Sequence, residues 1–258
     1  RLVELPVRDL LEHDVAEARV GPEPAADADV HRLDELAVDL LEHALDADVG
    51  DLVLRAARGA AREVQPEVLA VAVGRDVLVE EGILSLELTL TTPDLLSVLP
   101  DIVGRYADAA DVGVGSILTE HDARLAIDCG ANYLVTPTMN VSVVRLAVER
   151  QIAIFPGGLT PTELAAGWHA GATAVKIFPA QTVGAAYLKH LRGPFPDLEA
   201  IPSGGVDLDA AGEWLDAGAV AVSIGGPLLG DALKGGDLAA LRDRCRTVRM
   251  VVDAPVHP

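Results

Sequence analysis

Lys176 has the clearest potential for covalent chemistry in this chain. It is one of three lysines in 258 residues, and it lies within the apolar run 174–179. In an extended strand, alternation places Lys176 and Phe178 on one face and Val175 and Ile177 on the other. Desolvation favours the neutral form of an amine, and a neutral amine attacks a ketone to form a Schiff base. The run alone fits equally well a lysine at a strand end whose ammonium reaches water.

A second reactive side chain, Glu87, belongs to the alternating segment 84–91. If this segment is a strand, its leucines face the covering helices, whereas Ser85, Glu87, Thr89 and Thr91 face the interior of a barrel. A carboxylate in such an interior is costly unless it is paired or used in chemistry. Glu87 is therefore a candidate acid/base group, with a structural ion pair as the alternative.

Small residues mark the ends of the next predicted strands. Gly113-Val114-Gly115-Ser116 brings a hydroxyl and bare backbone to the rim, and Thr136-Pro137-Thr138 does the same one strand later. Gly157-Gly158 leaves amide groups free to approach a ligand carboxylate closely. Gly157-Gly158 is therefore a candidate for binding a carboxylate, with an ordinary strand-to-helix turn as the alternative.

Two further glycine pairs, Gly204-Gly205 and Gly225-Gly226, end the last two predicted strands. Glycine turns after the seventh and eighth strands are where many barrels bind a phosphate through backbone N–H groups. Each pair alone is weak evidence, but the two in these places predict a phosphate site.

The elements that must position these residues alternate regularly from about residue 66. Helical stretches such as 121–130, 141–150 and 161–170 separate the strands, and Thr160 with Glu163 predicts a capping box before the last of them. The sequence therefore predicts an α/β chain, a (β/α)8 TIM barrel over residues 51–258, with 51–55 as the candidate first strand and a helix beginning at Pro66. The later predicted strands begin near Leu84, Val112, Tyr133, Ile152, Ala174, Glu199 and Ala219.

Residues 1–50 form a separate acidic N-terminal extension, predicted to be helical or partly disordered. Its histidines, His13, His31 and His43, are interpreted as solvated surface groups, because neither an HxxxH spacing nor a cysteine partner accompanies them. The sequence offers no cluster of metal ligands, and we expect no metal and no cofactor.

Composition narrows the possible partners and the compartment. Forty acidic and twenty basic residues give a formal charge of −20, which argues against nucleic acid and against an anionic membrane surface as partners. No apolar stretch is long enough to span a bilayer. Two cysteines far apart, Cys129 and Cys245, are typical of reduced thiols. We therefore expect a soluble, cytoplasmic protein.

Five motifs occur in the order found in one enzyme family. The chain resembles the 2-dehydro-3-deoxy-6-phosphogluconate (KDPG) / 4-hydroxy-2-oxoglutarate aldolases over about residues 66–242. This resemblance implies a class I (Schiff-base) aldolase that cleaves a 2-keto-3-deoxy sugar acid (phosphate) or a 4-hydroxy-2-oxo acid to pyruvate plus an aldehyde. The motifs are Glu-x-Thr-x-x-Thr-Pro (87–93), Gly-x-Gly-Ser (113–116), Pro-Gly-x-x-Thr-Pro-Thr-Glu (156–163), Val-Lys-x-Phe-Pro-Ala (175–180) and Pro-Ser-Gly-Gly-Val (202–206).

The resemblance also implies roles for the site residues. Lys176 is expected to be the Schiff-base lysine, and Glu87 the acid/base that acts through a water. The other positions are expected to bind the pyruvyl carboxylate (Ser116 and Gly157), to wall the pyruvyl pocket (Pro137 and Phe178) and to cradle the phosphate (Gly204, Gly205, Gly225 and Gly226). The partner is then a small-molecule 2-keto acid, and the protein a homo-oligomer, a trimer as is common in the family.

The chain departs from the family pattern where an anionic substrate is held. Many members have Arg in place of Thr91, which helps to hold the acidic substrate, and Ser often stands in place of Pro227. Ser116 occupies a slot usually filled by Thr, and the Arg of the first strand is matched only by Arg55. We therefore expect the aldolase chemistry with a modest preference for a phosphorylated substrate.

Two other interpretations remain open at this stage. In a different phosphate-binding (β/α)8 isomerase or synthase, Lys176 would act as a general base. In a non-catalytic oligomeric barrel scaffold, the acidic extension would be a partner surface. Covalent trapping with pyruvate separates the aldolase from both.

Overall fold

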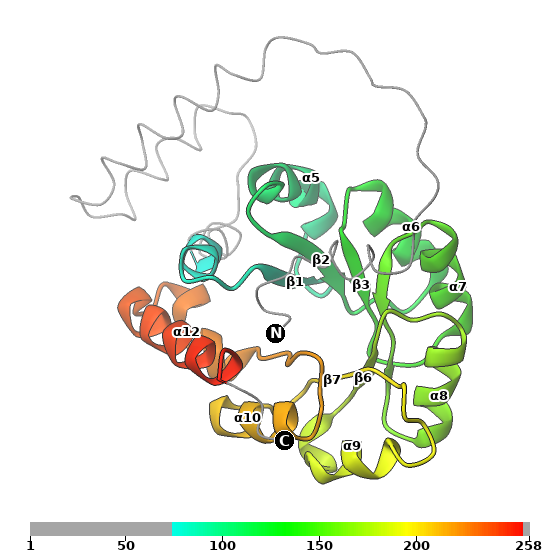
Figure 1. Cartoon of the computed structure of the whole chain (residues 1–258). Coiled ribbons are helices and arrows are strands. Elements are labelled where there is room, and N and C mark those ends of the chain that lie inside the picture. Colours follow the sequence, from blue (N-terminus) through cyan, green and yellow to red (C-terminus); the bar gives the residue numbers. More distant parts are fainter. Residues whose placement is uncertain (1–73, 255–258) are drawn as a thin grey trace, which may run out of the picture. The chain divides into compact units, whose positions relative to one another are not determined.

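The computed structural model describes residues 74–254 of the chain (Figure 1). The acidic extension 1–50, the candidate first strand 51–55 and the start of the helix expected from Pro66 lie outside the described residues. Residues 74–80 are helical and lead into the first described strand. Within the described part, no helix is long and apolar enough to cross a membrane.

Parallel strands follow one another in two sheets. The pairing orders are β1-β2-β3-β4 and β5-β6-β7, and Pro156 alone separates β4 from β5, so one stretch of chain belongs to both sheets. The strands are β1 (Ser85–Thr89), β2 (Asp111–Gly115), β3 (Tyr133–Val135), β4 (Ala153–Phe155), β5 (Gly157–Gly158), β6 (Val175–Ile177) and β7 (Ala200–Pro202). Apart from β5, which continues β4, each begins within one residue of the predicted position.

The last predicted strand, near Ala219, is present as an extended pairing to β7. Ser203 and Ser223 form a parallel bridge, and the N–H groups of Val220 and Ser223 donate to the carbonyls of Ala200 and Pro202 at 3.1 and 3.0 Å. All pairings are parallel, and a helix follows almost every strand. This arrangement confirms the α/β barrel class that the alternation predicted.

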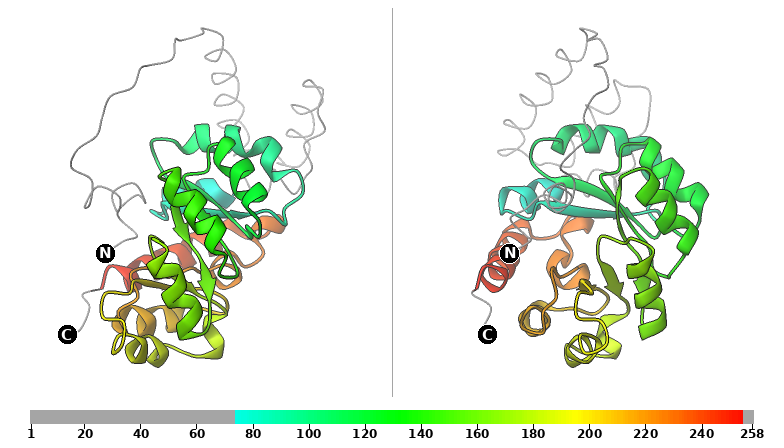
Figure 2. Two further views of the ribbon diagram at one scale, coloured as in Figure 1. Left: turned by 90° about the vertical axis from the view of Figure 1, so that its right-hand side faces the viewer. Right: turned by 45° about the vertical axis from the view of Figure 1, so that its right-hand side comes forward.

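Helices surround the strands in each of the views (Figures 1 and 2). Long crossovers of this kind are required between parallel strands, because each strand must return to the same end of the sheet. They are α5 (Leu95–Tyr106), α6 (Glu120–Asp128), α7 (Val141–Glu149), α8 (Pro161–His169), α9 (Ala186–Leu191), α10 (Leu208–Asp216), α11 (Gly226–Leu229) and α12 (Leu238–Val252), with short 3-10 turns η1 (Ala180–Thr182) and η2 (Ala232–Lys234).

Helix α8 begins at the predicted capping box. The Thr160 hydroxyl accepts from the Glu163 N–H at 3.3 Å, while Glu163 Oε2 accepts from the Thr160 N–H at 2.8 Å. These bonds satisfy two N–H groups that have no partner within the helix. The Thr160 hydroxyl also donates to Glu163 Oε2 at 2.7 Å, and this bond, together with those from the Thr160 and Leu159 N–H groups, lowers the pKa of the Glu163 carboxyl. The cap fixes where the chain turns from β5 into α8.

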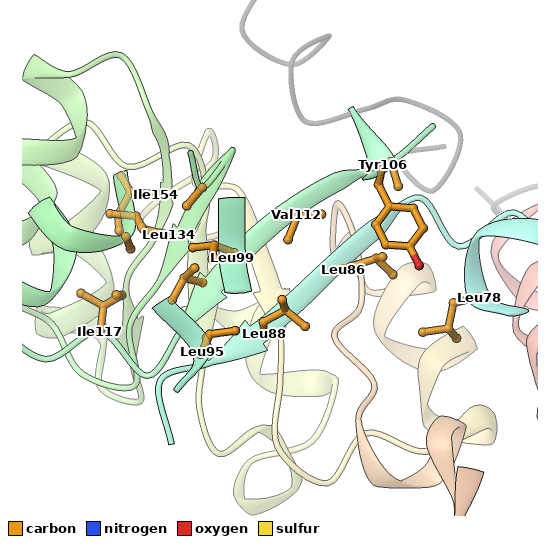
Figure 3. Close-up of a cluster of buried hydrophobic side chains, with 14 of the residues drawn as sticks. Leu78, Leu86, Leu88, Leu95, Leu99, Tyr106, Val112, Ile117, Leu134 and Ile154 are labelled. Atoms are coloured by element: carbon orange, nitrogen blue, oxygen red, sulfur yellow. The ribbon is translucent and has the colours of Figure 1, made fainter. Parts of the chain in front are cut away.

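The buried side chains separate into layers outside and inside the strands. Leu86 and Leu88 of β1 pack outward against Leu95 and Leu99 of α5 and against Val112 (Figure 3). Around β6, Val175 and Ile177 pack outward in the same way against α8 and α9. A separate cluster, formed by Tyr133, Val135, Ala153, Phe155 and Ala174, fills the interior. The strand alternation read from the sequence is therefore confirmed, and the faces left for Glu87 and Lys176 point inward.

Candidate active site

Lys176 lies on β6 in a largely dry environment. Its relative exposure is 8%, and its Nζ is 5.1 Å from the centroid of the Phe178 ring. Burial lowers the pKa of the ammonium, while the negative charge of Glu87 acts in the opposite direction. The amine is thus biased towards the neutral form that attacks a carbonyl, and it lies within the electrostatic reach of one carboxylate.

Glu87 projects from β1 across its neighbour β2. A Cβ atom on Gly115 would overlap Glu87 Oε1, so the carboxylate lies directly over this glycine. Gly115 is the last residue of β2, so the carboxylate is held at the C-terminal end of the strands. The glycines of the Gly-x-Gly-Ser motif, interpreted from sequence as bare backbone at the rim, therefore make room for side chains from neighbouring strands.

Ser116 follows Gly115 with a φ of +61°. A non-glycine residue in this left-handed region is uncommon, and such conformations are found preferentially at functional sites. The half-buried residue lies next in sequence to the glycine that receives the Glu87 carboxylate. Its placement agrees with its choice as a substrate-binding candidate.

Gly157 on β5 pairs with Lys176 on β6. A Cβ atom here would collide with the backbone of Thr136 and Pro137, so two of the candidates, Gly157 and Pro137, are in direct contact. The Gly157 N–H, however, donates to Thr136 Oγ1 at 3.1 Å. The expectation of a free amide at this position is therefore corrected, because the Thr136 hydroxyl already occupies it.

The two glycine pairs differ in their surroundings. Gly204 and Gly205 have φ values of +85° and +76°, and a Cβ on Gly204 would come within 2.9 Å of the Phe178 ring. The first pair therefore adjoins the lysine site. Gly225 and Gly226 are exposed with open space beside them, and Pro227 in the first turn of α11 has no N–H to offer.

Thr91 lies just beyond the end of β1. It is exposed, and its hydroxyl is hydrogen-bonded to that of Thr89 at 2.8 Å. Both hydroxyls therefore lie beyond Glu87 towards the C-terminal end of the same strand.

Comparison with known proteins agrees with this geometry. The family model described as "Aldolase: KDPG and KHG aldolase" matches residues 64–243. The chain is 32% identical over 168 residues to the 2-dehydro-3-deoxy-6-phosphogalactonate aldolase of Escherichia coli K12, covering 65% of this chain and 81% of the relative. The chain belongs to the KDPG and KHG aldolase family.

Two further relatives support the assignment. The KHG/KDPG aldolase of Escherichia coli K12 is 31% identical over 163 residues, covering 62% of this chain and 76% of that protein. A solved structure described as native KDPGal superposes with a TM-score of 0.66 at 27% identity, covering 74% of this chain and 90% of that one. The protein is accordingly an aldolase, a carbon–carbon lyase, which favours the aldolase over the isomerase, synthase and scaffold interpretations.

Two inward-facing polar residues of this aldolase, Tyr133 and Ser203, were not among the predicted site residues. Tyr133 is almost fully buried, and Ser203, also buried, donates from its hydroxyl to that of Ser223 at 3.3 Å. The signal that places Tyr133 and Ser203 inward is the alternation of side chains along the strands that begin near Tyr133 and Glu199. Among residues 74–254, no group of three or more His, Cys, Asp or Glu side chains is arranged to hold a metal ion.

Proposed function

We propose that this aldolase cleaves a 2-keto-3-deoxy sugar acid, as the phosphate or the free acid, with Lys176 as the Schiff-base residue and Glu87 as the acid/base group. The burial of Lys176 is the observation that carries the proposal. The Lys176 side chain is buried, and burial lowers the pKa of its amine. The carboxylate that acts on this pKa is Glu87 of β1. A nucleophilic amine and a group able to move protons are the two requirements of this chemistry.

The chemical steps follow from these two groups. The neutral Lys176 amine adds to the C2 ketone, and the carbinolamine hydroxyl takes up a proton and leaves as water to give an iminium ion. Glu87, acting through a water, takes the proton of the C4 hydroxyl as the C3–C4 bond breaks, and the electron pair of that bond moves into an enamine. Protonation of the enamine at C3 and addition of water then release pyruvate and restore the amine.

The remaining candidates have roles that match their places. Ser116 binds the pyruvyl carboxylate, and Gly157 lies beside it without offering its N–H, which already donates to Thr136 Oγ1. Pro137 and Phe178 wall the pyruvyl pocket. The glycine pairs Gly204-Gly205 and Gly225-Gly226 cradle a terminal phosphate, and Thr91 lies near the acidic part of the substrate.

The substrate class is supported by the relatives. Their names give 2-dehydro-3-deoxy-6-phosphogalactonate, KDPG and KHG as the compounds on which they act. All are acids with a 2-keto group and a C4 hydroxyl, which is the arrangement that an iminium at C2 can cleave. A trimeric, cytoplasmic enzyme is part of this proposal, and both cysteines of the described residues are free thiols, as a reducing compartment requires.

Covalent trapping tests the role of Lys176. Incubation with pyruvate and borohydride is expected to add one reduced pyruvyl group per chain, on the peptide that contains residues 175–179. Lys176→Arg keeps the positive charge but forms no imine, so both the adduct and the turnover should vanish. Lys189→Arg, at an exposed position of α9, is the matched control and should trap normally. An adduct on Lys189 or Lys234 would contradict the proposal.

A further inference from the structure

Tyr133 crosses the interior from β3 to β1. Its partner on β2 is Gly113, and a Cβ on Gly113 would overlap the Tyr133 ring, so the ring lies directly over this glycine. Beyond β2, the Tyr133 hydroxyl accepts a hydrogen bond from Ser85 Oγ of β1 at 3.1 Å. On its other side the ring meets Phe155 edge-on, with centroids 5.6 Å apart. The side chain is therefore held on both sides.

Glu87 enters the same space from the opposite strand. It lies two residues after Ser85 on the same face of β1, and its own partner on β2 is Gly113. The Tyr133 ring already occupies the space over Gly113. The Glu87 carboxylate lies instead over Gly115, two residues nearer the C-terminal end of β2.

We infer that Tyr133 is a positioning residue for Glu87: its ring fills the space over Gly113 and so keeps the carboxylate at the end of the barrel where Lys176 reacts. The inference rests on the proposed acid/base role of Glu87. The Tyr133 ring from β3 lies over Gly113, and the Glu87 carboxylate from β1 lies over Gly115. The position of the ring therefore determines where the carboxylate can lie. Without the ring, the Glu87 side chain has room to turn down towards Gly113 and away from the substrate.

The ring acts through its bulk and not through charge. The Tyr133 hydroxyl is directed to Ser85, away from the position of the carboxylate over Gly115. Burial, together with the negative charges of Glu87 and Asp111, raises the pKa of the phenol well above its ordinary value of 10.0. The phenol is therefore neutral at physiological pH and does not repel Glu87.

A double-mutant cycle tests this coupling. Tyr133→Leu replaces the ring by a smaller apolar side chain, and Tyr133→Phe keeps the ring but lacks the hydroxyl. Each substitution is made in the wild type and in Glu87→Gln. For every variant we measure kcat for the cleavage of 2-keto-3-deoxy-6-phosphogalactonate and the yield of borohydride trapping with pyruvate. In the wild type, Tyr133→Leu should lower kcat roughly ten- to hundredfold, the size expected for a misplaced reacting group. In Glu87→Gln it should change kcat less than about twofold, and trapping should persist throughout.

Several results would overturn the inference. An equal loss from Tyr133→Leu in both backgrounds means that the ring supports only the fold, and a loss from Tyr133→Phe as large as that from Tyr133→Leu means that the hydroxyl acts. Should Tyr133→Leu fail to fold by its thermal transition, Tyr133→Met, with an adaptable apolar side chain, replaces it in the same cycle. The proposed acid/base role of Glu87 is contradicted by a different result, namely a kcat of the Glu87→Gln single variant equal to that of the wild type.

Discussion

Two opposing influences act on the amine of Lys176. Burial lowers its pKa from the ordinary value of 10.5, and the charge of Glu87 raises it. The first influence provides the neutral nucleophile, and the second limits how far the pKa falls. Burial and the Glu87 carboxylate, the proposed acid/base group, therefore together determine the pH at which the amine is neutral.

The pH dependence of imine formation should reveal this balance. In the wild type, the rate of trapping with pyruvate should rise with pH and have its midpoint below the ordinary lysine pKa of 10.5, because burial lowers the pKa of the Lys176 amine. Glu87→Gln removes a charge that raises the Lys176 pKa, so the midpoint should move to lower pH. Glu149→Gln, at an exposed position of α7, is the control and should leave the midpoint unchanged. A midpoint that stays or moves upward in Glu87→Gln would show that the two groups do not interact.

At the scale of elements, the sequence predicted the strands well and the contacts between them poorly. Starts and faces of strands follow from alternation within one segment, so Lys176 and Glu87 were correctly placed inward. The bond from Gly157 to Thr136 and the reach of Tyr133 over Gly113 join different strands. They depend on strand order and register, and no local pattern contains that information.

The capping box of α8 was readable because all of its atoms come from four consecutive residues. Thr160→Ala should lower the free energy of unfolding by about 0.5–2 kcal/mol, measured by urea denaturation. The exposed neighbour Thr162, in the same turn, is the matched control, and Thr162→Ala should change it by less than about 0.5 kcal/mol.

Acidification should weaken the contribution of this cap. The Glu163 pKa is lowered in the folded protein, so its share of the stability is present above the unfolded pKa and disappears as pH falls through the folded pKa. The difference between wild type and Thr160→Ala should therefore shrink in acid. A Thr160→Ala protein as stable as the wild type at neutral pH would show that the cap contributes nothing.

At the scale of the whole described region, parallel pairing gathers residues that are far apart in the chain. The candidates extend from Glu87 to Gly226, yet each lies at or near the C-terminal end of a strand or in the turn that follows it. The lysine and carboxylate part of this site could be predicted from sequence. How the site holds a phosphate could not, because Pro227 and Thr91 alter it in ways that a motif does not quantify.

Substrate preference is the property in which these departures should appear. A charge-assisted contact contributes about 1.5–3 kcal/mol, so its loss weakens an anionic substrate by roughly one to two powers of ten. We expect a modest kcat/KM preference for phosphorylated over unphosphorylated 2-keto-3-deoxy acids. Thr91→Arg should increase this preference, whereas the neutral Thr91→Gln should not. A wild-type preference of several powers of ten would contradict this and show that the glycine pairs suffice.

Because the Tyr133 ring lies directly over Gly113, the side chains at positions 113 and 133 share one limited space. Any side chain at 113 takes space from the ring, and a smaller residue at 133 opens that space to neighbouring side chains. A larger side chain at position 113 is therefore tolerated only when residue 133 becomes smaller. Any redesign of this barrel that enlarges residue 113 should therefore change residue 133 with it.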